Sequence, residues 1–522
     1  MLARMRDDSH TDVFTALNHI RTRSLLTGLL AAATMSAGLA GCNGDVRTVR
    51  MVPMGGGHDG TRVTLASPSG PLRLTHRVGG TQHRLLIVDE TWYQADGTQL
   101  LVLDERGIER GRIDFGDGGN VGPICDMCVA DGRLYVVLED TAVAAIALDG
   151  GPETSLVLYD DVDRLGIEPR SVGIVQREVY ASGVGGVVRL SDGALIFEQP
   201  GELVSRVAMT TSGLAACIDR RVYATGTGDY LGTASELAAL PDAFDLAGML
   251  AFIRRNDGGG RVGLMRPTMR EVHAVDATDS LVGRLHRLRL FDGRLWVVAE
   301  GRLVAYRVEG HAIERELEVT VPGIRDVDGL PDGSLAVCGT FGRGVIAPPR
   351  TGMVDDPVFV HHVPAPGDLR QGRFDGRYAL LAGATGAWMY HPGRGVESVS
   401  LEVDDDGPDR EVRILDGSAS IDEGGAVVVG TTSGTSTHAA SATCLAAVEG
   451  DVWVGHDQGI TVLRLDPNAA ADEANHAVVA SWRVAGNVIR LWPLLKGNGA
   501  VYVSDEGGVG VLQWGTASAS AE

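Results

Sequence analysis

Short runs of alternating apolar and polar residues, separated by glycine-containing turns, recur along most of this chain. Phe291–Gly310 shows the repeating unit. It opens with Asp292-Gly293, a tight-turn dipeptide, because glycine tolerates positive φ and aspartate can bond its own backbone. Leu295–Ala299 is then aliphatic, aromatic and β-branched, which predicts a strand, and Leu303–Val308 predicts its hairpin partner. Since a single hairpin is only marginally stable, many copies imply stacked sheets.

Further versions of this hairpin occur at 85–104, 131–150, 177–190, 212–226, 248–265, 331–348, 375–393, 423–434, 449–466 and 497–514. Their spacing of about 35–45 residues is typical of four-stranded propeller blades. Each hairpin is preceded by a short alternating segment that predicts an innermost strand, and is followed by a segment that predicts an outer strand. We therefore predict an all-β fold, a β-propeller of repeated four-stranded antiparallel blades with about 7–10 units.

The number of units leaves the arrangement open. About ten partial or full units exceed the usual 4–8 blades of a propeller. An unusually large ring, extra hairpins, or two rings in tandem would each account for the surplus. Because no Pro/Ser-rich linker divides residues 73–516, we expect one continuous body. Its incomplete first and last units should pair with each other, which would close the ring and remove sheet edges.

These units resemble those of bacterial β-propeller repeat proteins, such as the YVTN and quinoprotein-like repeats, over residues 73–516. In the quinoprotein repeat a tryptophan follows an aspartate and a glycine at a fixed distance. Trp482 and Trp514 lie near such places, but most units lack the tryptophan. The resemblance therefore implies the propeller fold without a quinone cofactor, and we expect no cofactor.

The N-terminal segment has the features of a targeting signal. Arg21 and Arg23 precede the apolar run Leu25–Leu39, which is of secretory type and short for a membrane span. The run ends in the tetrapeptide LAGC at 39–42, which resembles the lipobox of bacterial lipoproteins. The resemblance implies cleavage before Cys42 and lipid attachment to that residue. An ordinary secreted protein or an uncleaved anchor is the alternative.

We accordingly assign residues 1–41 to a signal peptide and 42–72 to a flexible tether, since the latter are rich in Gly, Pro and polar residues. Several acyl chains together hold a protein stably on a membrane. Asn43 follows the modified cysteine, and by resemblance to the enterobacterial sorting pattern a residue other than Asp there points to the outer membrane. Residues 517–522 are expected to form a disordered tail.

The charge of the chain excludes one class of partner. The formal net charge is −22, with one lysine (Lys496) and 45 arginines. Non-specific nucleic-acid binding needs a basic surface, so we expect no nucleic-acid partner. The preference for arginine is better explained by a GC-rich coding bias than by recruitment of guanidinium groups for binding.

One arginine pattern suggests a site. An arginine recurs a few residues before the turn that follows the innermost strand of many units: Arg170, Arg206, Arg287, Arg325, Arg370 and Arg490, with Arg413 as a further candidate. Because innermost strands line the central channel, these residues should form a circle around one channel mouth. Each could pair with a carboxylate of the adjacent blade, such as Asp326, Asp328 or Glu168, since an unpaired buried guanidinium is costly. Alternatively, they bind a carboxylate or sulfated ligand through bidentate contacts.

Cys125-Asp126-Met127-Cys128 is the one CxxC motif. It precedes a predicted strand, and residues three apart in an extended strand point to opposite faces unless a turn intervenes. No histidine and no second CxxC follows at metal-binding spacing. We favour buried core cysteines over a structural disulfide, and either over redox or metal chemistry.

The other polar motifs give no catalytic or metal site. His361 and His362 are adjacent, so their side chains should diverge in a strand, and Asp404-Asp405-Asp406 lacks the spacing of a calcium loop. The hairpin loops on the face of the arginines vary between units, as binding loops on a regular scaffold do. They include Glu139, Arg254, Arg255, Arg343, His456, Asp457 and Asp505.

Two functions from different classes fit these observations. We expect a non-catalytic binding or scaffold protein, lipid-anchored to a bacterial membrane and facing the periplasm or cell surface, with an envelope protein or a polysaccharide as partner. The alternative is an envelope enzyme of the propeller lactonase, lyase or quinoprotein type, with its site at the channel mouth. A deep mouth pocket holding the arginines and a His or Asp pair would favour catalysis, whereas a flat or plugged face would favour binding.

Overall fold

The computed structural model describes residues 46–48, 51–52, 72–80, 84–115, 121–148, 157–175, 177–210, 213–218, 221–224, 230–233, 236–239, 250–256, 259–267, 272–309, 312–349, 354–355, 357–392 and, with short gaps, 394–514. The expected leader (1–41), Cys42 and the expected tail (517–522) lie outside these residues. Within the described part every element is a strand except the four-residue helix α1 (Val162–Leu165). No helix there is long and apolar enough to cross a membrane.

The strands pair into ten sheets, most of them four-stranded and antiparallel. One six-stranded sheet contains two blades. The first half of β14 (Ala194–Thr210) pairs with β13 (Glu178–Arg189), and its second half pairs with β15 (Gly213–Ile218). Nine sheets with one blade each and one sheet with two give eleven blades among the described residues. The predicted all-β propeller architecture is confirmed, with slightly more blades than predicted.

The first seven blades follow each other along the chain. Blade 1 consists of β4 (Leu85–Val88), β5 (Thr91–Asp96), β6 (Gln99–Leu103) and β7 (Glu109–Asp114), and blade 2 of β8 (Ile124–Ala130), β9 (Arg133–Leu138), β10 (Ala142–Ala147) and β11 (Val157–Asp161). Blade 3 consists of β12 (Glu168–Val175), both halves of β13 and the first half of β14, and blade 4 of the second half of β14, β15, β16 (Arg221–Ala224) and β17 (Tyr230–Thr233). Blade 5 consists of β18 (Glu236–Ala239), β19 (Leu250–Asn256), β20 (Gly259–Pro267) and β21 (Val272–Val282). Blade 6 consists of β22 (Leu285–Phe291), β23 (Arg294–Ala299), β24 (Arg302–Glu309) and β25 (Ala312–Thr320), and blade 7 of β26 (Ile324–Gly329), β27 (Leu335–Gly339), β28 (Gly342–Ile346) and β30 (Phe359–Pro364).

These seven blades form a closed ring. Their innermost strands contact one another in the order β4, β8, β12, β14, β18, β22, β26, and β26 contacts β4 again. An apolar cluster at the seam joins Leu85 and Trp92 of blade 1 to Ala336 and Val345 of blade 7. The four antiparallel strands of each ring blade come from one stretch of chain, so the seam closes by packing rather than by strand exchange.

The remaining four blades form a second group, called here the four-blade set. Blade 8 consists of β31 (Leu369–Phe374), β32 (Ala379–Gly383), β33 (Gly386–His391) and β34 (Gly395–Val399), and blade 9 of β35 (Glu411–Ile414), β36 (Gly417–Ile421), β37 (Val427–Thr431) and β38 (Gly434–His438). Blade 10 consists of β39 (Ala442–Val448), β40 (Asp451–His456), β41 (Gly459–Leu465) and β42 (His476–Arg483), and blade 11 of β43 (Val488–Pro493), β44 (Gly499–Ser504), β45 (Gly508–Trp514) and β3 (Leu72–Val78). The innermost strands pack in the order β35, β39, β43, β31, so blade 8 lies against blade 11.

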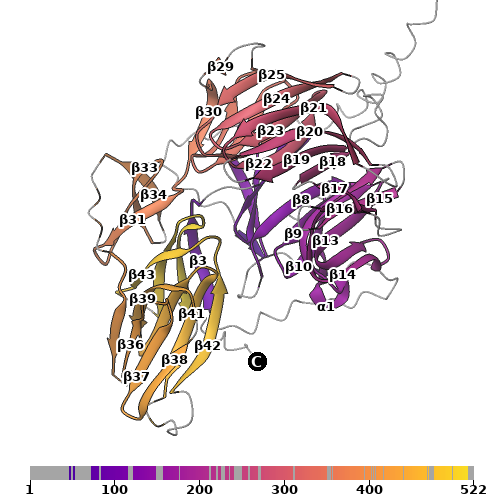
Figure 1. Cartoon of the computed structure of the whole chain (residues 1–522). Coiled ribbons are helices and arrows are strands. Elements are labelled where there is room, and N and C mark those ends of the chain that lie inside the picture. Colours follow the sequence, from indigo (N-terminus) through magenta and orange to yellow (C-terminus); the bar gives the residue numbers. More distant parts are fainter. Residues whose placement is uncertain are drawn as a thin grey trace, which may run out of the picture. The chain divides into compact units, whose positions relative to one another are not determined.

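The chain ends of the repeat region pair as predicted, but in the four-blade set. β3 runs antiparallel to β45, with Leu72 opposite Trp514. Figure 1 shows β3, in indigo, among the orange and yellow strands of the C-terminal region. The chain therefore starts the four-blade set with β3, builds the ring, and returns. The two groups of blades lie within one compact unit of the chain, Gly41–Glu522. The hairpin pattern is local and carries no signal for which blade faces pack together.

Short strands cover three outer edges of the ring. β1 (Val46–Thr48) pairs in parallel with β7, β2 (Met51–Val52) with β11, and β29 (Val354–Asp355) with β25. β1 and β2 belong to the segment 42–72 that the composition predicts to be a tether. An edge strand has unpaired backbone groups, and these additions satisfy some of them.

The unit Phe291–Gly310 shows why the sequence forms blades. Asp292 and Gly293 both have positive φ, 51° and 66°, the turn that matches the twist of a hairpin. In β23, Leu295 packs against blade 5 residues, whereas Trp296 packs against blade 7 residues. Alternate side chains thus bury both faces of the sheet, and the strand is scaffold.

Candidate functional site

A β-bulge recurs near the start of the innermost strand in eight blades. In each case the register shifts by one residue, which leaves an extra residue unpaired. The extra residues are Cys125, Arg170, Ser205, His286, Arg325, Arg370, Thr443 and Ile489. The bulge creates two positions at this end of the strand: the bulged residue and the residue that follows it.

The six predicted arginines divide between these two positions. Arg170, Arg325 and Arg370 are bulged residues. Arg287 and Arg490 follow the bulge and are buried, with 5% and 6% of their surfaces exposed. The remaining residue, Arg206, also follows a bulge, and its side chain lies outside the described part. The sequence pattern was found by counting residues back from the turn, and such a count cannot detect the extra residue of a bulge. The pattern therefore combined bulged residues with residues that follow a bulge.

The arginines also belong to two groups of blades. Arg170, Arg287 and Arg325 lie in the ring, whereas Arg370 and Arg490 lie in blades 8 and 11 of the four-blade set. The predicted circle around one channel mouth is therefore corrected. Arg413, the further candidate, is exposed in blade 9 and contacts Glu411 at 3.6 Å.

A buried ion pair with its hydrogen-bonding partners spans the middle of the ring. The guanidinium of Arg287, in blade 6, donates to the Asp126 carboxylate of blade 2 at 2.8 Å. Since blades 7 and 1 lie between them on the shorter way round, this contact crosses the ring. Asp126 also accepts a hydrogen bond from the Ser171 hydroxyl of blade 3 at 2.9 Å. Both members of the ion pair are almost inaccessible, with 6% and 1% of their side chains exposed.

A second ionic contact holds the seam. Arg289 donates to both carboxylate oxygens of Asp326, at 3.0 and 2.7 Å, and to the backbone carbonyl of Leu85 at 2.8 Å. Asp326 accepts from the Leu85 backbone N–H at 3.2 Å. Blades 6, 7 and 1 therefore share one network. Burial alone would lower the pKa of Arg289, but Asp326 outweighs it and the pKa is raised.

Asp328, two residues after Asp326 on β26, adds another contact between blades 7 and 1. Its carboxylate accepts from the Ile87 backbone N–H at 2.8 Å. Burial raises the pKa of Asp328, and the positive charge of the nearby Arg289 partly offsets this rise. The sequence pattern named Asp326 and Asp328 as partners of the recurring arginines. It missed Arg289, whose place two residues after Arg287 on the same face of an alternating strand was the available signal.

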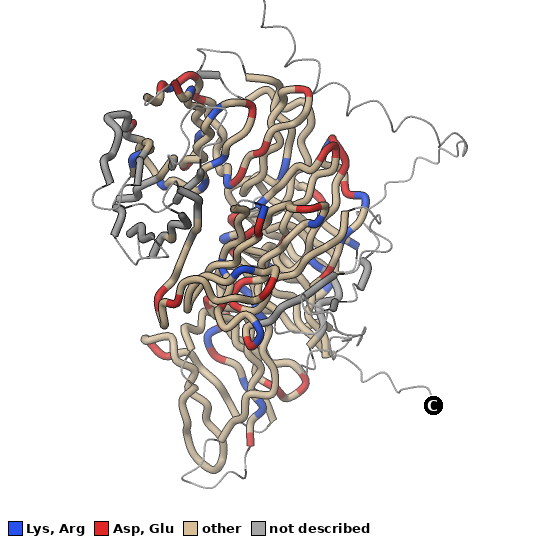
Figure 2. The backbone as a smooth tube through the Cα atoms, turned by 90° about the vertical axis from the view of Figure 1, so that its right-hand side faces the viewer, with Lys and Arg blue, Asp and Glu red and all other residues tan. Residues whose placement is uncertain are grey.

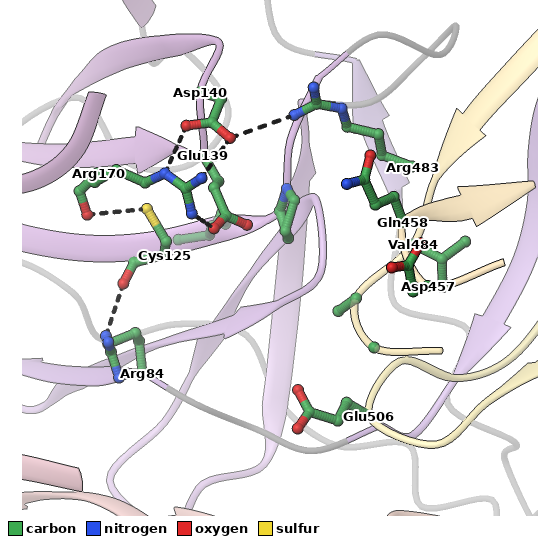
Figure 3. Close-up of a pocket in the computed structure, with 14 residues that line it drawn as sticks. Arg84, Cys125, Glu139, Asp140, Arg170, Asp457, Gln458, Arg483, Val484 and Glu506 are labelled. Atoms are coloured by element: carbon green, nitrogen blue, oxygen red, sulfur yellow. Dashed lines mark hydrogen bonds and ion pairs between the residues drawn. The ribbon is translucent and has the colours of Figure 1, made fainter. Parts of the chain in front are cut away.

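A pocket of about 500 Å³ lies beside the bulged residues of blades 2 and 3. Its lining from the ring includes Arg84, Pro123, Ile124, Cys125, Glu139, Asp140 and Arg170. The turns and strand ends of blades 10 and 11 supply Asp457, Gln458, Arg483, Val484, Ala485, Gly486 and Glu506. We call this the mouth pocket (Figure 3). Its size is in the usual range for ligand pockets.

The guanidinium groups of the mouth pocket contact carboxylates and carbonyls. Arg170 pairs with Glu139 and, at 2.5 Å, with Asp140. Arg483 lies 3.9 Å from the same Asp140, which therefore stands between two arginines, as Figure 3 shows. Arg84 donates from Nε to the backbone carbonyl of Cys125 at 2.7 Å. Arg170, which belongs to the predicted arginine pattern, thus has acidic partners from blade 2.

Cys125 and Cys128 are both free thiols, so no disulfide links them. The bulge at Cys125 corrects the expectation that they point to opposite faces, because both pack against the apolar cluster between blades 2 and 3. The Cys125 thiol donates to the Arg170 carbonyl at 3.2 Å. Burial, aided by Asp126, raises the pKa of Cys125 above its ordinary value, so the thiol stays protonated and is a poor nucleophile.

The other predicted residues are spread over the molecule. Arg325 contacts the His286 ring at 2.7 Å, and Arg370 is exposed. Arg490 donates to both oxygens of Asp405, at 2.5 and 2.6 Å. The contact of Arg325 thus lies in the ring, and the ion pair of Arg490 lies in the four-blade set.

Several of the predicted loop residues have structural partners. Arg343 is buried and donates to the Gly107 carbonyl at 2.6 Å, and Asp505 accepts from the Asn487 backbone at 2.8 Å. His361 is half-buried and His362 is exposed, as alternation predicts. Glu139 and Asp457 line the mouth pocket. The side chains of Arg254 and Arg255 lie outside the described part.

Among the residues that the structure describes, no group of three or more His, Cys, Asp or Glu side chains has the arrangement of a metal site. No histidine is among the described residues that line the mouth pocket. The described lining of the pocket therefore offers charged hydrogen-bonding groups together with the apolar residues Pro123, Ile124, Val484 and Ala485. Such an arrangement can bind a polar group.

Comparisons with known proteins give similarities of fold only. No protein family and no curated protein matches the chain. Among solved structures it is similar to PorZ, a surface component of the type-IX secretion system of Porphyromonas gingivalis, with 11% identity and a TM-score of 0.41 over 84% of this chain and 82% of that one. It is also similar to the WD40 domain of Toxoplasma gondii coronin, with 14% identity and a TM-score of 0.38 over 55% and 88% of the two chains. YCF48, solved with a D1 peptide, gives 13% identity and a TM-score of 0.36 over 54% and 98%. The fold assignment rests on the strand pairing above.

Proposed function

We propose that this chain is a non-catalytic binding protein of the bacterial envelope, held to a membrane by a lipid on Cys42. Its binding surface is the mouth pocket and the turns around it, and its partner is a protein. The membrane and the lipid are inferred from the segment 1–42, through its apolar run and the LAGC tetrapeptide.

The main support for this proposal is the buried ion pair across the middle of the ring. Propeller enzymes of the alternative class need convergent groups at an accessible channel mouth. In this ring the space across the middle is occupied by the ion pair of Arg287 with Asp126, both buried. A substrate could enter only by breaking a buried ion pair, which typically costs about 3–5 kcal/mol when one partner is lost. The charged groups that remain accessible lie at the edge, in the mouth pocket.

The distribution of charge fits a binding surface with a soluble scaffold. Figure 2 shows acidic and basic residues interspersed along the backbone. The exposed ion pairs of the outer strands, such as Arg307 with Glu314 at 2.7 Å, keep the edges polar. The varied turns of the mouth then provide the specific contacts, as loops on rigid scaffolds commonly do.

Lipid anchorage is tested with the Cys42→Ser variant in the native host or a close surrogate. The wild type should incorporate labelled palmitate and sediment with membranes, and the variant should do neither. A wild-type protein that is unlabelled and soluble would contradict the anchor.

The binding surface is tested by site-specific photocrosslinking in intact envelopes. A photoreactive residue replaces Gln458 in the mouth pocket or, as a matched control, the exposed Thr435 on β38. The first should give an adduct with one defined protein that the control lacks. Adducts with polysaccharide alone would overturn the choice of a protein partner, and the absence of any specific adduct would overturn binding at the mouth.

A further inference from the structure

The segment that follows the proposed lipid site is paired with the outer edge of the ring. β1 runs parallel to β7 of blade 1, with Val46 opposite Arg112. β2 runs parallel to β11 of blade 2, with Met51 opposite Val157. Each pairing adds one strand to a blade through backbone hydrogen bonds. The chain is therefore attached to the ring well before β3, where the repeat region begins.

This attachment limits how far the ring can lie from a lipid on Cys42. Three residues separate Cys42 from Val46, and a fully extended chain of this length reaches roughly 14 Å. If β3 were the first attached strand, 29 residues would separate Cys42 from Leu72, with a reach of roughly 100 Å. With β1 paired, a lipid on Cys42 would hold the outer edge of blade 1 close to the bilayer.

The direction of β1 indicates which end of blade 1 would face the bilayer. Because β1 and β7 are parallel, β1 starts at the same end of the blade as β7. A turn joins the end of β6 to the start of β7 at this end. We call residues 104–110, which include this turn, the blade 1 tip. The chain enters β1 from the side of the tip, so a lipid on Cys42 would place the tip nearest the membrane.

The blade 1 tip is held in shape by its own contacts. The Asp104 carboxylate accepts hydrogen bonds from the backbone N–H groups of Arg106 and Ile108, at 3.0 and 2.9 Å. The backbone carbonyl of Gly107 accepts a hydrogen bond from the buried Arg343 of blade 7 at 2.6 Å. The tip is thus a fixed feature of the ring surface.

The exposed side chains of the tip suit the boundary between water and lipid. Ile108 is the one large apolar residue of the turn, and 42% of its surface is exposed. The side chains of Arg106 and Arg110 are 71% and 68% exposed. Arginine can lay its aliphatic stem along apolar surface while its charged head stays in water. Glu105 and Asp104 pair with these arginines, so the anchor rather than electrostatic attraction would bring the tip to a bilayer.

The mouth pocket lies at the other end of the blades. Its lining includes Ile124, the first residue of β8, and Glu139, which follows β9. The Ile124 backbone N–H donates to the carbonyl of Gly97 at 2.7 Å, in the turn between β5 and β6. Since β6 runs from this turn to the blade 1 tip, the tip and the mouth lie at opposite ends of blade 1. A membrane at the tip would leave the mouth accessible.

We propose that the blade 1 tip contacts the lipid bilayer that holds the Cys42 anchor, and that β1 and β2 fix this orientation so that the mouth pocket is directed away from the membrane. The proposal rests on the lipid anchor of the function proposed above and adds the surface that meets the bilayer. A segment that only linked the lipid to the folded body would need neither strand pairing.

The first test measures the distance of the tip from lipid. The full-length acylated protein is reconstituted in vesicles of phosphatidylethanolamine and phosphatidylglycerol that contain lipids with a nitroxide on the head group. A genetically encoded fluorescent residue replaces Ile108 or, as a matched control, Val282, an aliphatic residue that is 70% exposed at the mouth end of blade 5. The label at 108 should lose fluorescence, and the label at 282 should keep it. Equal quenching at both positions, or none at 108, would overturn the proposal.

Two insertions test whether β1 and β2 set this distance. A Gly/Ser segment of about 20 residues, which spans about 25 Å as a flexible coil, is placed either between Asp45 and Val46 or between Gly60 and Thr61. The first lies before β1 and should abolish quenching of the label at Ile108. The second lies after β2 and should leave the quenching unchanged. Equal effects of the two insertions, including none from either, would show that the paired strands do not hold the ring and would overturn the proposal.

Palmitate labelling of the same preparation distinguishes this inference from the proposed function. If the protein is labelled and sediments with membranes but the residue at position 108 is not quenched, the inference alone fails. If the protein is unlabelled and soluble, the lipid anchor of the proposed function fails, and the inference fails with it.

Discussion

At the residue scale, the bulge near the start of each innermost strand decides which charged side chains are buried. In blade 6 the bulged residue is His286, and the next residue, Arg287, is turned into the ring. In blade 2 the bulged residue is Cys125, and Asp126 takes the inward position. Opposite charges therefore occupy equivalent positions in blades that face each other. A shift of one residue would expose both, because side chains alternate along a strand.

The seam network gives a first prediction. Asp326→Ala should lower the free energy of unfolding by about 3–5 kcal/mol, because it leaves Arg289 buried without its carboxylate. The exposed Asp163 provides the control, and Asp163→Ala should change stability by less than about 0.5 kcal/mol. Chemical denaturation measures both, and similar values for the two variants would contradict the seam.

A histidine pair gives a pH-dependent prediction. His438 of blade 9 and His476 of blade 10 form an edge-to-face contact with ring centroids 5.5 Å apart. Burial lowers the pKa of each, and for His476 the proximity of His438 adds to the effect. The unfolded chain therefore binds more protons than the folded one just below the ordinary histidine pKa of about 6.5.

Stability should accordingly be complete above about pH 7 and decline as the pH falls through the unfolded pKa toward the folded values. The double variant H438N/H476N should show a smaller decline, since it removes two of the titrating rings and leaves His456, whose pKa burial also lowers. Thermal unfolding between pH 5 and 8 measures the difference in slope. An unchanged slope in the double variant would show that other groups cause the pH dependence.

At the scale of elements, the hairpins follow from turn chemistry and alternation. Gly293 at the turn has φ of 66°, and Trp296 and Leu295 fill opposite faces of one strand. These features are local, so the sequence was sufficient to place the hairpins of every blade. The bulges were not predictable in the same way, because an extra residue in a strand has no side-chain signature. The unpredicted bulges explain why Cys125 and Cys128 were expected on opposite faces. They also explain why two kinds of arginine position were treated as one.

The turn gives a matched pair of glycine variants. Gly293→Ala should destabilise by about 1 kcal/mol, since alanine at positive φ is strained although no neighbour would meet its Cβ. Gly111→Ala also meets no neighbouring atom, and its backbone is not left-handed, so it should be neutral or slightly stabilising. Equal effects in chemical denaturation would contradict the proposed turn geometry.

At the scale of the whole molecule, the ring is inserted into the four-blade set between β3 and blade 8. The pairing of Leu72 with Trp514 joins residues at the two ends of the repeat region. The sequence indicated that the terminal units were incomplete, which was enough to predict their pairing. It contained no signal that the ring would close separately, because closure depends on contacts such as Trp92 with Ala336 between distant segments.

Disruption of β3 should therefore affect the two groups of blades unequally. Leu72 is 1% exposed in the core of blades 10 and 11, so Leu72→Asp should strongly destabilise the four-blade set. Hydrogen exchange should accelerate in β44 and β45 and remain slow in β22 and β23 of the ring. Leu415→Asp, at a fully exposed position, serves as the control and should change neither. Uniform acceleration across both groups would contradict their separate closure.

The pair of Arg287 with Asp126 closes the middle of the ring and leaves binding to the mouth. A double-mutant cycle with R287Q and D126N in chemical denaturation measures whether the two side chains meet. We expect each single variant to lose about 3–5 kcal/mol and the pair to show a coupling energy of about 2–3 kcal/mol, because the second substitution removes a charge that the first left unpaired. The exposed Arg370, in the other group of blades, should show additivity with D126N within about 0.5 kcal/mol. Additive effects of R287Q and D126N would show that the two residues do not meet, and would contradict the plugged ring.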